Sequence, residues 1–428
     1  MSSPTRFPAV PLDLLVHKWQ ARGGGEFIAQ MELAFDRRLD EHLLARAVGL
    51  LLDTAPILAC RLVVDSSGPF WQRLPRGTPQ PLMITDDGGA YGRFRHSGLD
   101  ATQGAQVALC LWRGGGGDRL LIKITHQVGD GGGLHMIAAR LSDIYATLHR
   151  EPEYRPQPAG ETSRDVMQLL PRVPWPTILW TFVRFIASRW FPQRTCMLPL
   201  PDSSVGAWCF VERHLPASRV SLLSAYGRAQ DATLNDMFVA AAYRALASRA
   251  TWDGTSSLRI LITVDLRRYL ARSCEAVANL SAMDCPYLGR TLGGSVDETI
   301  ANVRTVMHRR KQNWPGLAMV WLTYLGVRLE RHGRHAADRR HRNSRFRKIT
   351  LSNTGPIDKA RVAFAGRPPV SACILPPFRT LPGLLICLSG YDGSLTLSAG
   401  TSENGEALIG GFLDAMLSEL PVEQFAPA

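Results

Sequence analysis

The segment best suited to chemistry is Leu121–Gly133, which reads LIKITHQVGDGGG. An apolar strand leads into His126, and Asp130 follows four positions later, ahead of three glycines. A histidine at a strand end can serve as a general base near neutral pH, and glycines let a backbone approach a ligand closely. We therefore take His126 as the candidate base. Asp130 is expected to accept a hydrogen bond within the loop or to pair with a distant arginine. A histidine that merely ends a strand is the alternative, because a single HxxxDG pattern often arises by chance.

The elements around this segment predict how it is positioned. Residues 105–112 and 119–125 have the pattern of two strands, and the glycines at 114–117 form the turn of a hairpin between them. Residues 134–148 predict a helix after the glycine run, and residues 40–53 predict another helix, with Asp40 as its N-cap.

The second half of the chain mixes helices and strands without strict alternation, which favours an α+β fold. Residues 231–250 predict a helix capped by Asp231 or Thr233. The further predicted elements are strands at 258–264, 349–352, 383–389 and 394–398 and a closing helix at 407–420.

A proline-rich stretch at 151–201 separates the halves, because that density of proline breaks regular structure. We expect an N-terminal lobe at 1–160, a crossover linker at 161–205 and a C-terminal lobe at 206–428. Residues 176–192 predict a helix within the linker, with Pro176 in its first turn. We favour packing of this helix against one lobe; the alternative is peripheral docking on a membrane or on a lipid-like substrate.

Composition excludes several classes of protein. With 45% hydrophobic and 20% charged residues, the chain can bury a large core. Its longest uncharged run, 173–183, is too short to span a membrane, and no secretory signal is expected. None of the eight cysteines forms a CxxC pair, so we expect reduced thiols, no metal site and a cytoplasmic location.

The net charge of +12 is concentrated in an arginine-rich segment, residues 327–348, which holds nine basic and two acidic side chains. We favour a solvated surface segment, and we do not expect nucleic-acid binding. An alternative is contact with the phosphate of coenzyme A or phosphopantetheine, or with an acidic carrier protein. A metal site at His332, His335, Asp338 and His341 is rejected, because the surrounding arginines repel a cation.

The stretch THQVGDGGG resembles the HHxxxDG signature of the chloramphenicol acetyltransferase-like superfamily, which includes condensation domains of peptide synthetases, wax ester synthase-like enzymes and polyketide-associated acyltransferases. Five further segments resemble the family in the correct order: PLDLLVHKW at 11–19, TLNDMFVAAAYRAL at 233–246, ITVDLRRYL at 262–270, LSNTGPI at 351–357 and YDGSLTLSAG at 391–400. The first histidine of the signature is Thr125 here, whereas His126 stands at the catalytic position. The superfamily also includes the plant HxxxD acyltransferases, but no clear DFGWG segment is present, which argues against that branch.

The resemblance implies two similar lobes that form a V, with a tunnel between them and His126 in its middle. It implies transfer of an acyl group from a thioester to a hydroxyl or amine. The donor would be acyl-coenzyme A or a phosphopantetheinyl thioester on an acyl or peptidyl carrier protein, and no permanently bound cofactor is expected. The resemblance also implies that Asp130 is structural, bonded to an arginine of the other lobe, for which Arg267 is the candidate.

Direct transfer without an acyl-enzyme is preferred, because no G-x-S-x-G elbow is present. The oxyanion donors could be the backbone N–H groups around Gly131 and Gly132 or the hydroxyl of Ser352. Asn235 either caps its helix or contacts substrate, and Asn353 either bridges the lobes or faces the tunnel. A non-catalytic carrier-binding or gatekeeping domain on the same fold is the competing function.

Overall fold

The computed structural model describes residues 5–66, 68–156, 163–190, 195–270, 276–321 and 348–422, with the side chains of 184–190 excepted. Contacts divide the chain into two compact units. Unit 1 comprises residues 1–168, 267–281 and 354–377, and unit 2 comprises 169–266, 282–353 and 378–428. The chain thus passes between the units repeatedly, whereas the division expected from the sequence, at 160 and 205, follows chain order.

Unit 1 is built on a five-stranded sheet in the order β13-β3-β8-β7-β6. The strands are β3 (Ile28–Ala34), β6 (Leu82–Thr85), β7 (Val107–Gly114), β8 (Gly117–Thr125) and β13 (Ser371–Leu375). All pairings are antiparallel except that of β6 with β7. The edge strand β13 arrives from far along the chain, and it pairs residue by residue with β3. A small second sheet has the order β1-β5-β4, formed by Arg6–Pro8, Gly68–Arg73 and Cys60–Asp65.

The hairpin of β7 and β8 turns where predicted, with Gly114 paired to Gly117. Gly117 has a φ of +133°, and a Cβ placed there would lie 2.0 Å from the carbonyl oxygen of Phe35. Only glycine fits this position, because the backbone is left-handed and the next strand lies against it.

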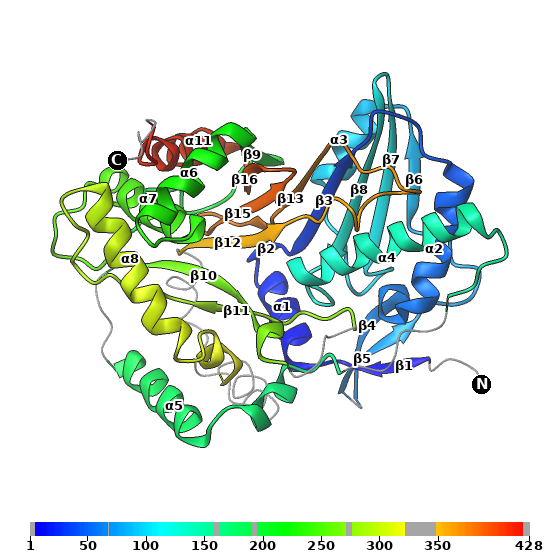
Figure 1. Cartoon of the computed structure of the whole chain (residues 1–428). Coiled ribbons are helices and arrows are strands. Elements are labelled where there is room, and N and C mark those ends of the chain that lie inside the picture. The colour runs from blue at the N-terminus through cyan, green and yellow to red at the C-terminus, as the bar shows by residue number, and fades with distance from the viewer. Residues whose placement is uncertain are drawn as a thin grey trace. The chain divides into compact units, whose positions relative to one another are not determined.

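The helices α2 (Glu41–Thr54) and α4 (Gly131–Arg150) pack against each other, and α4 packs against β3, so these helices cover one face of the sheet (Figure 1). Asp40 caps α2 as predicted, since its carboxylate accepts the Leu43 N–H at 2.9 Å. The remaining elements of unit 1 are α1 (Pro11–Ala21), β2 (Gly25–Glu26), the 3₁₀ helix η1 (Pro56–Ala59), α3 (Gly88–His96), η2 (Val166–Arg172) and η3 (Leu266–Tyr269), the last two crossing its boundaries.

Unit 2 holds a mixed sheet of its own. Its strands follow the order β11-β10-β12-β15-β16-β14, and β9 also pairs with β16. The strands are β9 (Trp208–Leu215), β10 (Ile260–Asp265), β11 (Ser281–Asp284), β12 (Ile349–Pro356), β14 (Phe378–Arg379), β15 (Leu384–Tyr391) and β16 (Ser394–Ser402). Strand β10 runs parallel to β12, and β15 and β16 form an antiparallel hairpin.

Three helices pack on this sheet: α6 (Ala217–Ala229) and α11 (Glu403–Ser418) contact β16, and α7 (Leu234–Arg249) contacts β10, while α8 (Val296–Lys311) packs on α7 (Figure 1). Thr233 caps α7 in a capping box with Asp236. Of the two caps considered from the sequence, Thr233 is therefore the one used. The core between helices and sheet is aliphatic and aromatic, with Phe238, Tyr243 and Phe412 fully buried.

The proline-rich stretch contains one long helix, α5 (Trp175–Trp190), close to the predicted bounds. Its side chains were expected to pack against a lobe, but several large apolar ones are exposed, among them Trp175 at 73% and Trp180 at 62%. Within the described residues, no helix combines the length and the apolar character needed to cross a membrane.

Helices and strands are found at every range predicted from the sequence, and the α+β class is confirmed.

Candidate active site

His126 directly follows the last residue of β8, and its backbone N–H donates to the carbonyl oxygen of Phe27 at 2.8 Å. Its neighbours Thr125 and Gln127 are each 1% exposed, whereas His126 is only half-buried. The strand end therefore fixes the backbone, while the imidazole is neither sealed in the core nor fully in solvent.

A buried polar network supports this strand end. The Thr125 hydroxyl donates to Oε1 of Gln106 at 2.7 Å, and Nε2 of Gln106 donates to the carbonyl oxygens of Cys60 and Ala101. Thr125, at the position of the signature's first histidine, thus anchors the strand below His126. Because these buried donors and acceptors are paired, the network favours one position of the strand end.

Asn279 is a site residue that sequence reasoning missed. Its Nδ2 lies 3.1 Å from Nδ1 of His126 and donates to the His126 carbonyl oxygen at 2.8 Å. The amide orientation follows from Ser281, whose backbone N–H can only donate and does so to Oδ1 of Asn279. Its one sequence signal is an asparagine among the apolar residues of 277–280, which a single sequence does not distinguish from a solvent-facing asparagine.

The contact with Asn279 bears on the tautomer of His126. An amide NH₂ group donates and does not accept, so both contacts of Nδ2 are satisfied when Nδ1 accepts and the neutral ring holds its proton on Nε2. In the other tautomer Nδ1 carries the proton, and Asn279 donates to the carbonyl oxygen alone. Asn279 therefore biases which ring nitrogen can take up a proton.

Asp130 is the N-cap of α4 and is almost fully buried. Its Oδ1 accepts the Gly133 N–H at 2.9 Å, and its Oδ2 accepts the Leu280 N–H at 2.8 Å and Nη1 of Arg267 at 2.9 Å. Burial by itself would raise the pKa of Asp130, but the Arg267 guanidinium and the hydrogen bonds lower that pKa below its ordinary value. The carboxylate is thus ionised and joins the start of α4 to residues 267–281.

Arg267 forms the ion pair with Asp130 that the resemblance implies, and it also donates to the carbonyl oxygen of Ala278 at 2.7 Å. By its contacts, however, Arg267 belongs to unit 1, together with Asp130, and not to a separate lobe. Both Arg267, just after strand β10, and Asn279, just before β11, lie beside the HxxxDG segment.

The glycines after Asp130 belong to the helix, whereas the sequence predicted a helix that begins after them, at 134. Gly131 is the first residue of α4, so the run forms the first helical turn and not a separate loop. No positive φ occurs at 131–133. A Cβ on Gly132 would lie 2.7 Å from Nη1 of Arg267. The small residue at 132 is therefore needed because the guanidinium packs directly over the helix start.

The other predicted site residues lie in unit 2 and are described there alone. The hydroxyl of Ser352, on β12, is 2.9 Å from that of Thr263 on β10. Nδ2 of Asn353 donates to Oδ1 of Asn235 at 3.4 Å. Asn235 lies in the first turn of α7, where Thr233 and Asp236 form the cap, so the capping role considered for Asn235 is filled by its neighbours.

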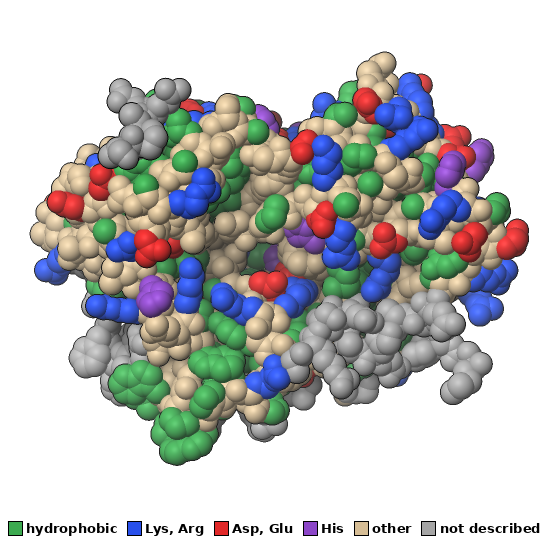
Figure 2. Space-filling model, viewed as in Figure 1, with side chains coloured by type: hydrophobic (Ala, Val, Ile, Leu, Met, Phe, Trp, Pro, Cys, Tyr) green, Lys and Arg blue, Asp and Glu red, His purple; other side chains and the backbone are tan. Residues whose placement is uncertain are grey.

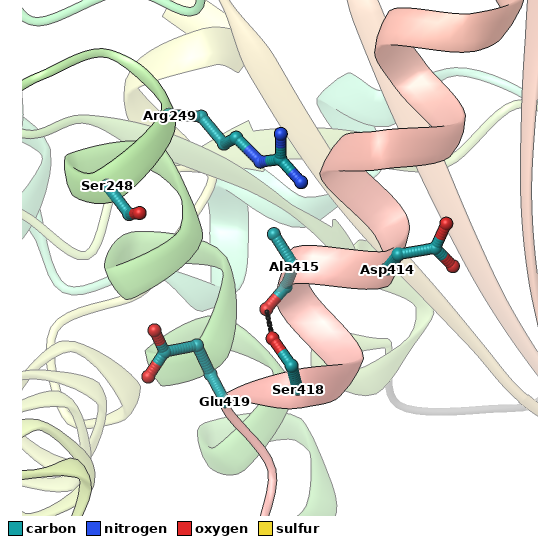
Figure 3. Close-up of a pocket in the computed structure, with 6 residues that line it drawn as sticks. All are labelled: Ser248, Arg249, Asp414, Ala415, Ser418 and Glu419. Atoms are coloured by element: carbon teal, nitrogen blue, oxygen red, sulfur yellow. Dashed lines mark hydrogen bonds between the residues drawn. The ribbon is translucent and has the colours of Figure 1, made fainter.

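Other features lie apart from these residues. Figure 3 shows a surface pocket of unit 2 between α7 and α11, lined by Ser248, Arg249, Asp414, Ala415, Ser418 and Glu419. No predicted site residue lines it, and its acids are already paired, Asp414 with Arg213 and Glu419 with Arg244. No group of three metal-ligating side chains occurs in the part of the chain that the structure describes. The arginine-rich segment lies outside the described residues, apart from Lys348.

No protein-family model and no curated protein matches the chain. Solved structures do match over nearly its whole length. The first condensation domain of the calcium-dependent antibiotic synthetase, in complex with a substrate analogue, is 18% identical over 97% of this chain and 96% of its own, with a TM-score of 0.71.

Two other solved structures give similar values. The epimerization domain from the third module of tyrocidine synthetase B is 14% identical over 97% of this chain and 96% of its own, with a TM-score of 0.68. Polyketide synthase associated protein 5 from Mycobacterium tuberculosis is 16% identical over 97% of this chain and 100% of its own, with a TM-score of 0.67. At these identities the likeness concerns the fold. The resemblance read from the sequence motifs is confirmed at that level: the chain has the chloramphenicol acetyltransferase-like fold of condensation domains.

Proposed function

We propose that the protein is a stand-alone condensation-like acyltransferase, which moves an acyl group from a thioester to a hydroxyl or amine in natural-product or lipid biosynthesis. The observation that carries the proposal is the half-buried His126 imidazole, held beside Asn279 and next to the buried Asp130–Arg267 ion pair. The condensation-domain fold supports it, because that fold brings an HxxxDG segment of this kind to a reaction centre in the implied family.

His126 acts as the general base in this proposal. The acceptor O–H or N–H loses its proton to Nε2 while its oxygen or nitrogen attacks the thioester carbonyl carbon. The carbon–sulfur bond then breaks, and the imidazolium returns the proton to the departing thiolate. General-base catalysis contributes roughly 10²- to 10⁴-fold to a rate. Nε2 can take the proton only when the neutral ring carries its own proton on Nδ1, so Asn279 must then donate to the carbonyl oxygen alone.

The oxyanion of the tetrahedral intermediate needs donors as well. Gly131 and Gly132 open α4, where backbone N–H groups have no partner within the helix and the helix dipole favours negative charge. We propose these N–H groups as donors, with the Ser352 hydroxyl as the alternative. Asp130 and Arg267 are positioning residues, because they fix the start of α4 and do not touch the reacting atoms.

The donor in this proposal is acyl-coenzyme A or a phosphopantetheinyl thioester on an acyl or peptidyl carrier protein. Structurally similar domains come from peptide synthetases, which favours a carrier-bound donor. A carrier-binding or gatekeeping domain without catalysis is the second candidate, because the same fold supports it. It predicts binding of a loaded carrier without turnover.

The deciding experiment offers a panel of acyl-coenzyme A and acyl-carrier thioesters with alcohol and amine acceptors and detects product by intact mass. We expect product with the parent chain and a loss of at least about 10²-fold in His126→Ala. His149→Ala is the matched control, since His149 is exposed near the end of α4, and it should keep parental turnover. Full turnover in His126→Ala would contradict the general-base role, whereas carrier binding without any product would favour the gatekeeping function.

A further inference from the structure

Helix α5 presents its apolar side to solvent. Trp175, Leu179 and Val183 follow one another at steps of four and are 73%, 53% and 46% exposed. Trp180 and Phe182 flank this row and are 62% and 36% exposed. Residues three and four apart share a helix face, so these five side chains form one continuous surface, which we call the α5 apolar face.

Within residues 175–183, whose side chains the structure describes, the side that carries the two threonines is the less exposed one. Thr177 and Thr181 lie with Ile178 on the opposite arc, and all three are only partly exposed. This is the reverse of an ordinary surface helix, which buries its apolar stripe and exposes its polar residues. Figure 2 shows hydrophobic side chains gathered over α5 at the lower left of the molecule. An exposed apolar surface of this kind marks an interaction site.

The charge around the helix indicates what covers this face. From Val166 to Pro201 the sequence carries four arginines, at 172, 184, 189 and 194, and no acidic residue. Tryptophan is enriched where a membrane meets water, and arginine is attracted to anionic headgroups. The α5 helix has 16 residues, a length of about 24 Å, which is shorter than the roughly 30 Å of a bilayer core. A helix of this kind lies in the interface and does not cross it.

We propose that the α5 apolar face docks the protein on an anionic lipid membrane. The indole rings of Trp175 and Trp180 and the Leu179 side chain enter the boundary between headgroups and acyl chains. The net positive charge of this stretch of sequence adds attraction to the lipid charge. The proposal depends on this surface alone and not on the acyltransferase activity, so failure of the enzymatic assay leaves it unaffected.

The test is flotation of the full chain with vesicles of phosphatidylcholine alone or mixed with phosphatidylglycerol. We expect the parent to float with the anionic vesicles, and binding should fall several-fold when salt is raised from about 50 to 500 mM, since the Debye length shrinks. Leu179→Asp should weaken partitioning by at least about tenfold, because a leucine side chain leaves the lipid.

The matched control is Leu408→Asp, which replaces a leucine that is 49% exposed on helix α11 of the same unit. It should float like the parent, and circular dichroism and melting curves should show that both variants fold. An equal loss in both variants, or no binding by the parent, would overturn the proposal. A third result would also overturn it: the parent does not bind vesicles and forms a dimer in vesicle-free buffer, and Leu179→Asp disrupts that dimer. The α5 apolar face would then bind a second copy of the chain.

Discussion

At the scale of single residues, His126 and Asn279 determine what the site can do. Asn279 approaches both the ring and the carbonyl oxygen of His126, and Ser281 fixes the amide that does so. A change at Asn279 therefore alters the proton position on the imidazole without removing the imidazole itself.

We expect Asn279→Asp to move the acidic limb of the kcat/KM profile to higher pH, because a carboxylate beside Nδ1 stabilises the imidazolium form. Asn279→Ala should lower kcat by about 2- to 10-fold with little change in KM, because the His126 carbonyl oxygen loses the hydrogen bond that helps to position the residue. Ser281→Ala is the control: it removes the hydroxyl hydrogen bond to Asn279, leaves the backbone one, and should cause a smaller loss. An unchanged pH profile in Asn279→Asp would show that Asn279 does not influence the proton on the ring.

The Asp130–Arg267 ion pair predicts a loss of stability. Asp130→Ala leaves a buried guanidinium without its partner, which costs about 3–5 kcal/mol. Because the folded-state pKa of Asp130 is lowered, its stabilisation is fully present above the ordinary value of 3.8 and is lost as pH falls through the lower folded value. Thermal melts of Asp130→Ala, Arg267→Ala and the double variant measure the coupling. The double variant should lose less than the sum of the single losses, and strict additivity would contradict direct pairing.

Sequence reasoning found three of the four residues that meet in unit 1, because His126, Asp130 and Arg267 lie in segments with a recognisable order. Asn279 was missed because its position beside His126 depends on tertiary contacts of residues 276–281, which no local pattern specifies. The Asp130–Arg267 contact was anticipated, but its place within one unit was not.

At the scale of elements, the C-terminal end of helix α3 is hydrogen-bonded to a buried lysine of strand β8. Lys123 of β8 is fully buried, and its ammonium donates to the carbonyl oxygens of Phe94 and Ser97 and to the Ser97 hydroxyl. It thereby adds a donor to the Phe94 carbonyl, which also accepts from Ser97, and supplies one to the Ser97 carbonyl at the helix end. Burial lowers the pKa of Lys123 to about 7.

This lowered pKa predicts a pH-dependent stability. Between about pH 7 and the ordinary lysine value near 10.4, the unfolded chain binds more protons than the folded one, so Lys123 makes stability rise with pH. From pH 7 to pH 9, the unfolding free energy of the parent should rise by about 1–3 kcal/mol more than that of Lys123→Met. Urea unfolding at both pH values measures the gain, with Lys359→Met, an exposed lysine of unit 1, as the control. Parallel curves for the parent and Lys123→Met would contradict the lowered pKa.

The sequence predicts elements with strong periodicity well, as in α2, α4, α7 and the β7–β8 hairpin. The short edge strand β13 was not predicted, because SACIL is as compatible with a loop as with a strand until β3 pairs with it. For α5 the helix was predicted from the sequence, but the side that it exposes was not. Which face is exposed depends on what the rest of the unit leaves uncovered.

At the scale of the whole molecule, unit 1 is assembled from three separate stretches of chain. Residues 354–377 supply β13, and residues 267–281 supply Arg267 and Asn279. Without them, the first stretch lacks a sheet edge and leaves Asp130 without its cationic partner.

A fragment of residues 1–168 should therefore not fold as a compact unit. We expect its amide NMR spectrum to be poorly dispersed and its thermal melt to lack a cooperative transition, because β3 would present an unpaired edge and Asp130 an unpaired buried charge. The full chain is the reference for both measurements. A cooperative melt and a dispersed spectrum for the fragment would show that the later segments are dispensable.

Because unit 1 consists of three separate stretches of the chain, only some junctions between related chains of this fold keep its contacts. A chimaera joined once within the proline-rich stretch would take Asp130 from one parent and Arg267 from the other. It would divide His126 and Asn279 between the parents in the same way. Junctions on either side of 267–281 and 354–377 would inherit both pairs from a single parent. Chimaeras of this fold should therefore be joined at those places.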